Sequence, residues 1–340
     1  MNTKYIVIPL LLLNTAPVLA QPTQAQIFEL NTSIVQVVVE NREGNTGYGS
    51  GVVVNHDYVA TNCHVLANAH GVSVNKVRDT YRPIALKADW KHDLCLLKFD
   101  DLPMKSIPMV DSSKLQYEQE VFSIGYPNDA QVPQPSFGNI KAIYPYDGAG
   151  IIRSSAEFAM GSSGGALFDQ DFNLIGITTF KSPGRNGYYY SLPVEWIRQL
   201  FDSPDINNLV STDDPFWSWP EEKRPYFMRV VIPYQKHRWT ELQQVAKSWS
   251  MEEGSNADAW YYLAVAEYQL KDNQQAAVHL AKATSLNPRH LGALVQQGVL
   301  AAEAGNKAEA ERINLVVNAL DTDEGTSLKE RIDKMQSVAQ

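Results

Sequence analysis

The chain has 340 residues, enough for about two domains of ordinary size, and 44% of them are hydrophobic, which excludes a disordered or fibrous protein. Asp and Glu number 38 against 29 Lys and Arg, and the resulting net charge of −9 argues against nucleic acid as a partner. Two cysteines can form one disulfide at most, which excludes a disulfide-stapled miniprotein and a zinc site built from cysteines.

The first twenty residues have the arrangement of a secretory signal peptide. Lys4 provides a positive charge, residues 6–13 form a short apolar run, and small residues lead up to Ala20. A membrane anchor is the alternative, but the run is shorter than the roughly 20 residues that span a bilayer. We therefore predict a signal peptide at residues 1–20, cleaved after Ala20, and a secreted or periplasmic mature chain without a membrane span.

Residues 24–202 have the pattern of an all-β domain, because short β-rich segments alternate with Gly, Asn, Asp and Pro. The expected strands are residues 34–39, 51–54, 94–99, 121–124, 174–180 and 188–192. Pro193 then begins a short helix, since Val194, Ile197 and Leu200 fall on one helical face. The pattern predicts a barrel or sandwich that this helix closes.

Residues 203–222 are rich in helix and strand breakers and predict a linker whose aromatic residues, Phe216, Trp217 and Trp219, dock on one domain. Residues 223–336 follow, with an alanine-rich helical period. Small and aromatic residues recur there at the offsets of a 34-residue pattern, at Trp260, Leu263, Ala264, Ala276, Leu280, Ala283 and Pro288. These offsets resemble tetratricopeptide repeats, of which about three fit the space. An unrelated all-α helical bundle is the alternative.

The candidate catalytic residues lie in the β-rich part of the chain. Ser163 stands in the glycine-rich turn Gly161–Gly165, where glycine permits positive φ and lets backbone amides converge on one point. An acyl-transfer serine needs a base and a carboxylate that orients the base, and His64 and Asp93 stand next to predicted strands. The chain order is His, Asp, Ser.

Other residues of the same types fit these functions less well. Of the nearby histidines, His56 lies in a turn, and His92 is expected on the strand face opposite Asp93. Asp89 is expected at the surface, and Ser162 precedes the nucleophile and points elsewhere.

Several segments occur in the order GSGVVV, TNCHV, HDLCLLKF, SIGYP, GSSGGALFD, LIGIT and YYYSLP. Together they resemble the trypsin-like serine peptidases, in particular the bacterial HtrA-like branch, over about residues 26–202. The resemblance implies a chymotrypsin-like fold of two six-stranded β-barrels with the active site in the cleft between them. The fold class is then multidomain, an all-β double barrel followed by an all-α tetratricopeptide-repeat domain.

The resemblance implies a serine-type endopeptidase with the triad His64, Asp93 and Ser163. The amides of Gly161 and Ser163 would form the oxyanion hole. The strand at Thr178, Thr179 and Phe180 would pair with an extended protein or peptide substrate. No metal and no organic cofactor is expected.

Two positions depart from the digestive enzymes of this class. Ser162 replaces the Asp that pairs with a newly freed N-terminus, so activation by that route is not expected. At the substrate-binding pocket, Glu157 is expected at the base and Tyr188 on the wall. Tyr188 would narrow the pocket towards small apolar side chains, and Glu157 would either select a cation or turn away.

The helical repeats are expected to bind a protein partner or substrate, with a rigid stabilising appendage as the alternative. A peptide-binding pseudoprotease and a repeat-based scaffold are the other functions that the sequence leaves open.

The two cysteines are predicted to form a disulfide. Cys63 adjoins His64, and Cys95 lies two residues beyond Asp93, so residue alternation along a strand would aim Cys95 and Asp93 the same way. If His64 and Asp93 meet, the cysteines come within bonding range. Two small buried thiols are the alternative.

Overall fold

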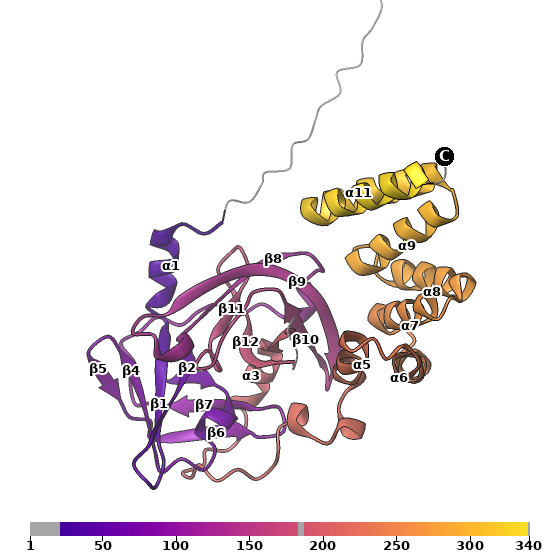
Figure 1. Ribbon diagram of the computed structural model, residues 1–340. Coiled ribbons are helices and arrows are strands. Elements are labelled where there is room, and N and C mark those ends of the chain that lie inside the picture. Colours follow the sequence, from indigo (N-terminus) through magenta and orange to yellow (C-terminus); the bar gives the residue numbers. More distant parts are fainter. Residues whose placement is uncertain (1–20, 183–186, 339–340) are drawn as a thin grey trace, which may run out of the picture.

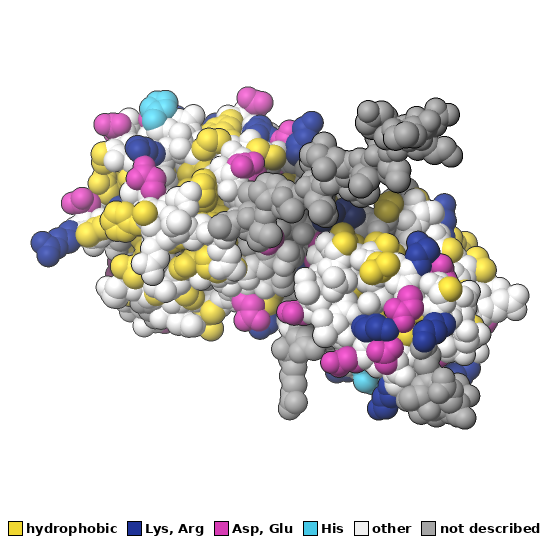
Figure 2. All heavy atoms as spheres, turned by 90° about the horizontal axis from the view of Figure 1, so that it is seen from above, with side chains coloured by type: hydrophobic (Ala, Val, Ile, Leu, Met, Phe, Trp, Pro, Cys, Tyr) yellow, Lys and Arg dark blue, Asp and Glu magenta, His cyan; other side chains and the backbone are white. Residues whose placement is uncertain are grey.

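The computed structural model describes residues 21–182 and 187–338, so the predicted signal peptide lies outside the described residues. Two β units come first in the chain, and a row of helices follows them (Figure 1). In this described range no helix has the length and apolarity to cross a membrane. On the face drawn in Figure 2, basic and acidic side chains are scattered over both parts.

The first β unit is a seven-stranded antiparallel sheet with the order β5-β4-β1-β2-β3-β7-β6. Its strands are β1 (Ile34–Glu40), β2 (Thr46–Asn55), β3 (Tyr58–Thr61), β4 (Gly71–Lys76), β5 (Asp79–Tyr81), β6 (Ala85–Asp89) and β7 (Leu94–Lys98). The prediction of a six-stranded barrel is therefore wrong for this unit. Strand β5 is a three-residue hairpin partner of β4, and β6 pairs with β7, so no strand ladder joins the two edges within the described residues.

The second β unit is a closed six-stranded barrel with the order β10-β13-β12-β11-β8-β9, which agrees with the prediction. Its strands are β8 (Glu120–Gly125), β9 (Gln134–Tyr146), β10 (Ala149–Ser154), β11 (Ala166–Phe168), β12 (Leu174–Lys181) and β13 (Tyr189–Pro193). Helix α3 (Val194–Leu200) begins directly after β13 and buries Trp196 and Ile197. Helix α1 (Gln24–Asn31) precedes the first unit, and the one-turn helix α2 (Cys63–Leu66) follows β3.

Ser50 of β2 connects the two β units. Its backbone N–H donates to the carbonyl of Ser163 at 2.7 Å, and its hydroxyl donates to the carbonyl of Gly161 at 2.8 Å. The hydroxyl also accepts from the N–H of Tyr126 at 2.9 Å. These buried bonds fix the glycine-rich turn of the barrel against the seven-stranded sheet.

The C-terminal helices follow a 34-residue period. They are α4 (Tyr226–Arg229), α5 (Val231–Gln235), α6 (Trp239–Glu252), α7 (Ala257–Gln269), α8 (Asn273–Leu286), α9 (Leu291–Glu303), α10 (Lys307–Leu320) and α11 (Thr322–Val338). Helices α6, α8 and α10 begin 34 residues apart, and so do α7 and α9. A residue with left-handed φ stands two positions before the start of α6, α8 and α10; these residues are His237, Lys271 and Gly305. The sequence period is therefore a structural repeat of helix pairs.

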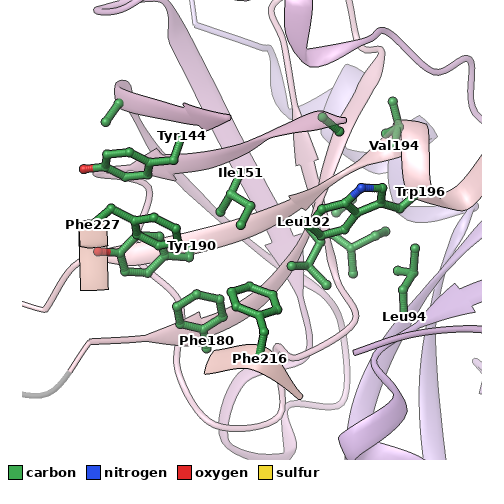
Figure 3. Packing of buried hydrophobic residues seen from close by; sticks show 14 of the residues in the cluster. Leu94, Tyr144, Ile151, Phe180, Tyr190, Leu192, Val194, Trp196, Phe216 and Phe227 are labelled. Carbon is green, nitrogen blue, oxygen red and sulfur yellow. The ribbon is translucent and has the colours of Figure 1, made fainter. Parts of the chain in front are cut away.

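One hydrophobic core runs from the closed barrel into these helices. Phe216 of the linker is fully buried, and Tyr144 of β9 stacks on Phe227 of α4 with 4.4 Å between ring centroids (Figure 3). Polar contacts surround this core: the Tyr117 hydroxyl donates to Asp258 Oδ2 at 2.6 Å, and Arg289 Nε donates to the Tyr117 carbonyl at 2.7 Å. The helices are thus packed against the barrel.

Candidate functional site

The turn that carries Ser163 depends on two glycines with positive φ. Gly161 has φ 90° and Gly164 has φ 86°, in the region that side chains disfavour. A Cβ at Gly161 would lie 2.5 Å from the Tyr126 carbonyl oxygen, and one at Gly164 would lie 2.1 Å from that of Ser50. Both positions therefore require glycine for conformation and for space.

His64 and Asp93 form a doubly hydrogen-bonded pair. The N–H of His64 donates to Asp93 Oδ1 at 2.7 Å, and His64 Nδ1 lies 2.6 Å from Asp93 Oδ2. Asp93 is 1% exposed and has a left-handed φ of 60°, a conformation that aspartate tolerates better than most residues. Its carbonyl accepts from the Asn62 side chain at 2.9 Å and from the N–H of Cys63 at 3.2 Å. The carboxylate can therefore orient the imidazole through Nδ1.

The Ser163 hydroxyl points to the carbonyl of Thr179, at 3.3 Å. No hydrogen bond joins this hydroxyl to His64 among the described residues. Rotation about the Cα–Cβ bond of Ser163 changes the direction of this hydroxyl, and hydrogen bonds at catalytic sites are commonly loose before substrate binds. In the described part of the chain, the N–H groups of Gly161 and Ser163 have no protein acceptor.

The alternative histidines are engaged elsewhere. His92 Nδ1 lies 2.6 Å from Asp89 Oδ2, and its ring stacks on Trp196 with centroids 4.1 Å apart. Burial raises the pKa of Asp89, but hydrogen bonds from His92 and the charges of His92 and Lys91 outweigh it, so that this pKa lies below its ordinary value. His56 lies at the surface beside Asp57.

A cleft of about 700 Å³ adjoins Ser163, and its walls include Glu157, Thr178, Thr179 and Tyr189. Tyr188 is not among the described residues that line this cleft, and its place on the pocket wall stays a prediction. It lines a separate cleft of about 650 Å³ between the barrel and the helices, where the Arg153 guanidinium lies 4.6 Å from its ring centroid. Tyr189, the first residue of β13, lines both clefts.

Phe180 is also absent from the described lining of the cleft near Ser163. It is buried, and its ring stacks on Tyr190 with centroids 4.6 Å apart. Its backbone still belongs to β12, beyond the point where β11 stops pairing with that strand at Ile177.

Cys63 and Cys95 form a disulfide, with 5.0 Å between their Cα atoms. The pairing of β3 with β7 places Thr61 opposite Cys95, and Cys63 lies two residues beyond Thr61. The expected alternation between Asp93 and Cys95 does not apply, because Asp93 precedes β7 and has left-handed φ. Register between two strands, not alternation along one, brings the cysteines together.

Trp217 of the linker also reaches this site. The sequence predicted that its side chain docks on one domain, but not that it contacts the catalytic pair. Its indole N–H donates to Asp93 Oδ2 at 3.0 Å, and its ring meets the His64 ring edge-on with centroids 5.6 Å apart. The arrangement as a whole offers a hydroxyl, an oriented imidazole and free amides, which are the parts that acyl transfer needs.

Comparison with known proteins finds similarity in the part of the chain that carries this site. Residues 49–177 match the trypsin-like peptidase domain. Serine protease HTRA1B of Danio rerio is 34% identical over 174 residues, which cover 48% of this chain and 36% of that protein. A probable periplasmic serine endoprotease, DegP-like, of Halomonas elongata is 31% identical over 178 residues, covering 50% of this chain and 37% of that protein. The chain thus spans little more than a third of the length of these relatives.

Among solved structures, the Rv3671c protease from M. tuberculosis in its active form superposes with a TM-score of 0.50 and 18% sequence identity. The match covers 61% of this chain and 99% of that one. At this level of identity the similarity concerns the fold alone. The matched trypsin-like segment ends at residue 177, well before the C-terminal helices begin.

Proposed function

We propose that this chain is a serine endopeptidase that hydrolyses peptide bonds through Ser163, His64 and Asp93. The observation that carries the proposal is the His64–Asp93 hydrogen bond of 2.6 Å, in a chain whose trypsin-like segment also contains Ser163 in its glycine-framed turn. In this proposal, residues 24–202 form the peptidase domain, residues 203–222 the linker and residues 223–336 the tetratricopeptide-repeat-like helices.

In the proposed mechanism the Ser163 Oγ attacks the substrate carbonyl carbon while His64 Nε2 accepts the hydroxyl proton. Asp93 stabilises the imidazolium through Nδ1. The C–N bond then breaks, the leaving amine takes the proton from His64, and an acyl-enzyme remains. Water then attacks the acyl-enzyme carbonyl with His64 as base, and the ester bond to Ser163 breaks to release the carboxylic acid. No electron donor or acceptor is consumed.

The amides of Gly161 and Ser163 are proposed to hold the oxyanion of the tetrahedral intermediate. Their lack of a protein acceptor in the described residues leaves both free to donate. Donors of this kind contribute on the order of 3 kcal/mol each to transition-state stabilisation.

The substrate is proposed to bind as an added strand along Thr178, Thr179 and Phe180. The support is that β11 pairs with β12 only as far as Ile177, followed by the bonds between Thr178 and the glycine turn. Main-chain pairing of this kind tolerates many sequences. Glu157 lines the cleft next to Ser163 and is proposed to face the side chain before the scissile bond.

The C-terminal helices are proposed to be tetratricopeptide repeats that recruit a protein partner or substrate. The 34-residue spacing of α6, α8 and α10 supports the repeat assignment. A secreted or periplasmic location, with cleavage after Ala20, is proposed from the signal-like start of the sequence.

The nucleophile is tested with the mature chain and a fluorophosphonate probe. Wild type is expected to be labelled and to cleave unfolded casein, whereas Ser163→Ala should lose both properties and keep its unfolding temperature. Ser162→Ala is the matched control and should retain labelling. An active Ser163→Ala variant would show that the nucleophile is assigned wrongly, and an unlabelled, inactive wild type would favour a peptide-binding pseudoprotease.

Recruitment by the helices is tested separately, by profiling cleavage sites in a protein mixture. Arg331→Glu changes the charge in the cleft between barrel and helices while leaving the Ser163 site untouched. We expect a changed set of substrates with unchanged hydrolysis of a short peptide. An identical set would favour the helices as a rigid appendage.

A further inference from the structure

Trp217 occupies a position beside the proposed catalytic pair, although it is 124 residues from Asp93 in the sequence. Its indole N–H donates to Asp93 Oδ2, the same oxygen that lies 2.6 Å from His64 Nδ1. The other carboxylate oxygen accepts from the backbone N–H of His64. Trp217 therefore supplies the third donor to a carboxylate group that is 1% exposed.

The indole ring makes two further contacts at this point. It meets the His64 ring edge-on, with an interplanar angle of 87°, and it stacks on Phe180 with centroids 5.7 Å apart. The ring thus lies against the base on one side and against the end of β12 on another. An edge-on neighbour of this kind resists rotation of the imidazole out of the plane that Asp93 selects.

The neighbours of Trp217 in the linker hold it in place. Phe216 is fully buried and contacts the rings of Tyr146, Phe180 and Trp196. The backbone N–H of Phe216 donates to the carbonyl of Lys91, two residues before Asp93, at 2.9 Å. The linker is therefore anchored directly before Trp217, through the Phe216 side chain in the core and its main-chain bond to Lys91.

We propose that Trp217 is a positioning residue of the His64–Asp93 pair. Its N–H fixes the carboxylate oxygen that accepts the hydrogen bond from His64 Nδ1, and its ring fixes the plane of the imidazole. A buried carboxylate oxygen that loses a donor is less well satisfied and less firmly oriented. The linker that leads to the helices is consequently a working part of the catalytic site. This inference rests on the proposed function, because it assigns Trp217 an effect on that same reaction.

The experiment compares Trp217→Phe with wild type in the full mature chain. Phenylalanine keeps an aromatic ring but removes the N–H donor. We expect kcat for a peptide amide substrate to fall about tenfold, with KM within twofold of wild type, because one hydrogen bond to a charged group is lost while substrate contacts remain. Trp217→Ala, which loses the ring as well, should lower kcat further.

Trp219→Phe is the matched control. The indole of Trp219 donates to the carbonyl of Asp214 at 2.9 Å, so this variant also loses a linker hydrogen bond, but one away from the catalytic pair. Its kcat should equal that of wild type. An unchanged kcat in Trp217→Phe, equal losses in both variants, or a rise in KM alone would overturn the proposal.

A spectroscopic readout separates this proposal from the proposed function. The low-field proton resonance between His64 Nδ1 and Asp93 should shift in Trp217→Phe and stay in place in Trp219→Phe, whether or not the chain hydrolyses peptides. If Trp217→Phe fails to fold, Asp93→Asn in an otherwise wild-type chain provides the second test, because it should shift the indole N–H resonance of Trp217. An unmoved resonance in the folded variant would overturn the proposal even in an active enzyme.

Discussion

At the scale of single residues, backbone conformation decides which side chains meet at this site. Asp93 has left-handed φ, and this lets its carboxylate face His64 while its carbonyl accepts from Asn62 and Cys63. Gly161 and Gly164 have left-handed φ in the turn that bears Ser163. The site thus depends on conformations that few residue types adopt.

Replacing Asp93 with Asn tests the orienting carboxylate. An amide at this position can present a donor to His64 Nδ1 and so favour the wrong tautomer of the imidazole. We expect kcat to fall about 10⁴-fold, the order seen when a triad carboxylate becomes an amide, with the fold retained. Steady-state kinetics beside a circular dichroism spectrum measures both. A loss of less than tenfold would exclude Asp93 as the orienter of the base.

Replacing Tyr188 with Ala tests whether its side chain lines the substrate pocket. Because Tyr188 faces the cleft next to the helices, we expect the preference for the residue before the scissile bond to stay as in wild type. Phe158→Ala is the positive control, since Phe158 lines the cleft at Ser163. Profiling with a peptide library measures both preferences. A broader profile in Tyr188→Ala would place its side chain back on the pocket wall.

At the scale of elements, the pairing of β3 with β7 joins the two segments that carry His64 and Asp93. The register sets Thr61 opposite Cys95, and the Cys63–Cys95 disulfide lies just beyond it. The base and its orienter are consequently held by a strand ladder and a covalent bond together.

Removing the disulfide should destabilise the fold. The bridge joins residues 32 positions apart, and the chain-entropy model gives about 3–4 kcal/mol for a loop of this size. We expect the free energy of unfolding of the Cys63→Ala, Cys95→Ala double variant, measured by urea unfolding, to be lower than that of wild type by this amount. Wild type under reducing conditions should behave alike. A double variant as stable as the oxidised wild type would contradict the expected contribution.

At the scale of the whole molecule, a buried polar cluster joins the barrel to the helices. Asp258 of α7 accepts from the Tyr117 hydroxyl at 2.6 Å and lies 3.8 Å from His290 Nε2. Arg153 of β10 donates to the Tyr262 hydroxyl at 3.1 Å. These polar contacts fix the orientation of the helices on the barrel, in addition to the apolar packing of Phe227 on Tyr144.

Asp258→Asn tests this cluster. Burial raises the pKa of Asp258, but the nearby His290, the charge of Arg153 and the hydrogen bond from Tyr117 outweigh it and hold the pKa below its ordinary value of 3.8. The ionised carboxylate therefore stabilises the fold above that pH, and this contribution disappears as the pH falls through the lower folded-state value.

We expect Asp258→Asn to lower the free energy of unfolding by about 1–3 kcal/mol at pH 7, through loss of charge-assisted hydrogen bonds. The difference from wild type should shrink at pH 2–3, which urea unfolding at the two pH values measures. Asp333→Asn on the exposed face of α11 is the control and should change little. An equal difference at both pH values would show that the charge of Asp258 is not what stabilises the interface.

The sequence by itself determined much of this protein. Spacing and residue type predicted the β-rich first part, the short helix after Pro193 and the 34-residue helical period, because each of these is encoded locally or by a repeated pattern. The candidate residues His64, Asp93 and Ser163 were also identifiable, since they stand in short motifs of fixed order.

Tertiary structure alone decided the remainder. It placed Tyr189 at the cleft beside Ser163 and Tyr188 at the cleft beside the helices, and it left the first β unit as a seven-stranded sheet. It also brought Trp217 to Asp93 from 124 residues away. The physical reason is that strand faces and edges are set by pairing register, and a contact between distant segments depends on how whole elements pack, which no local pattern records.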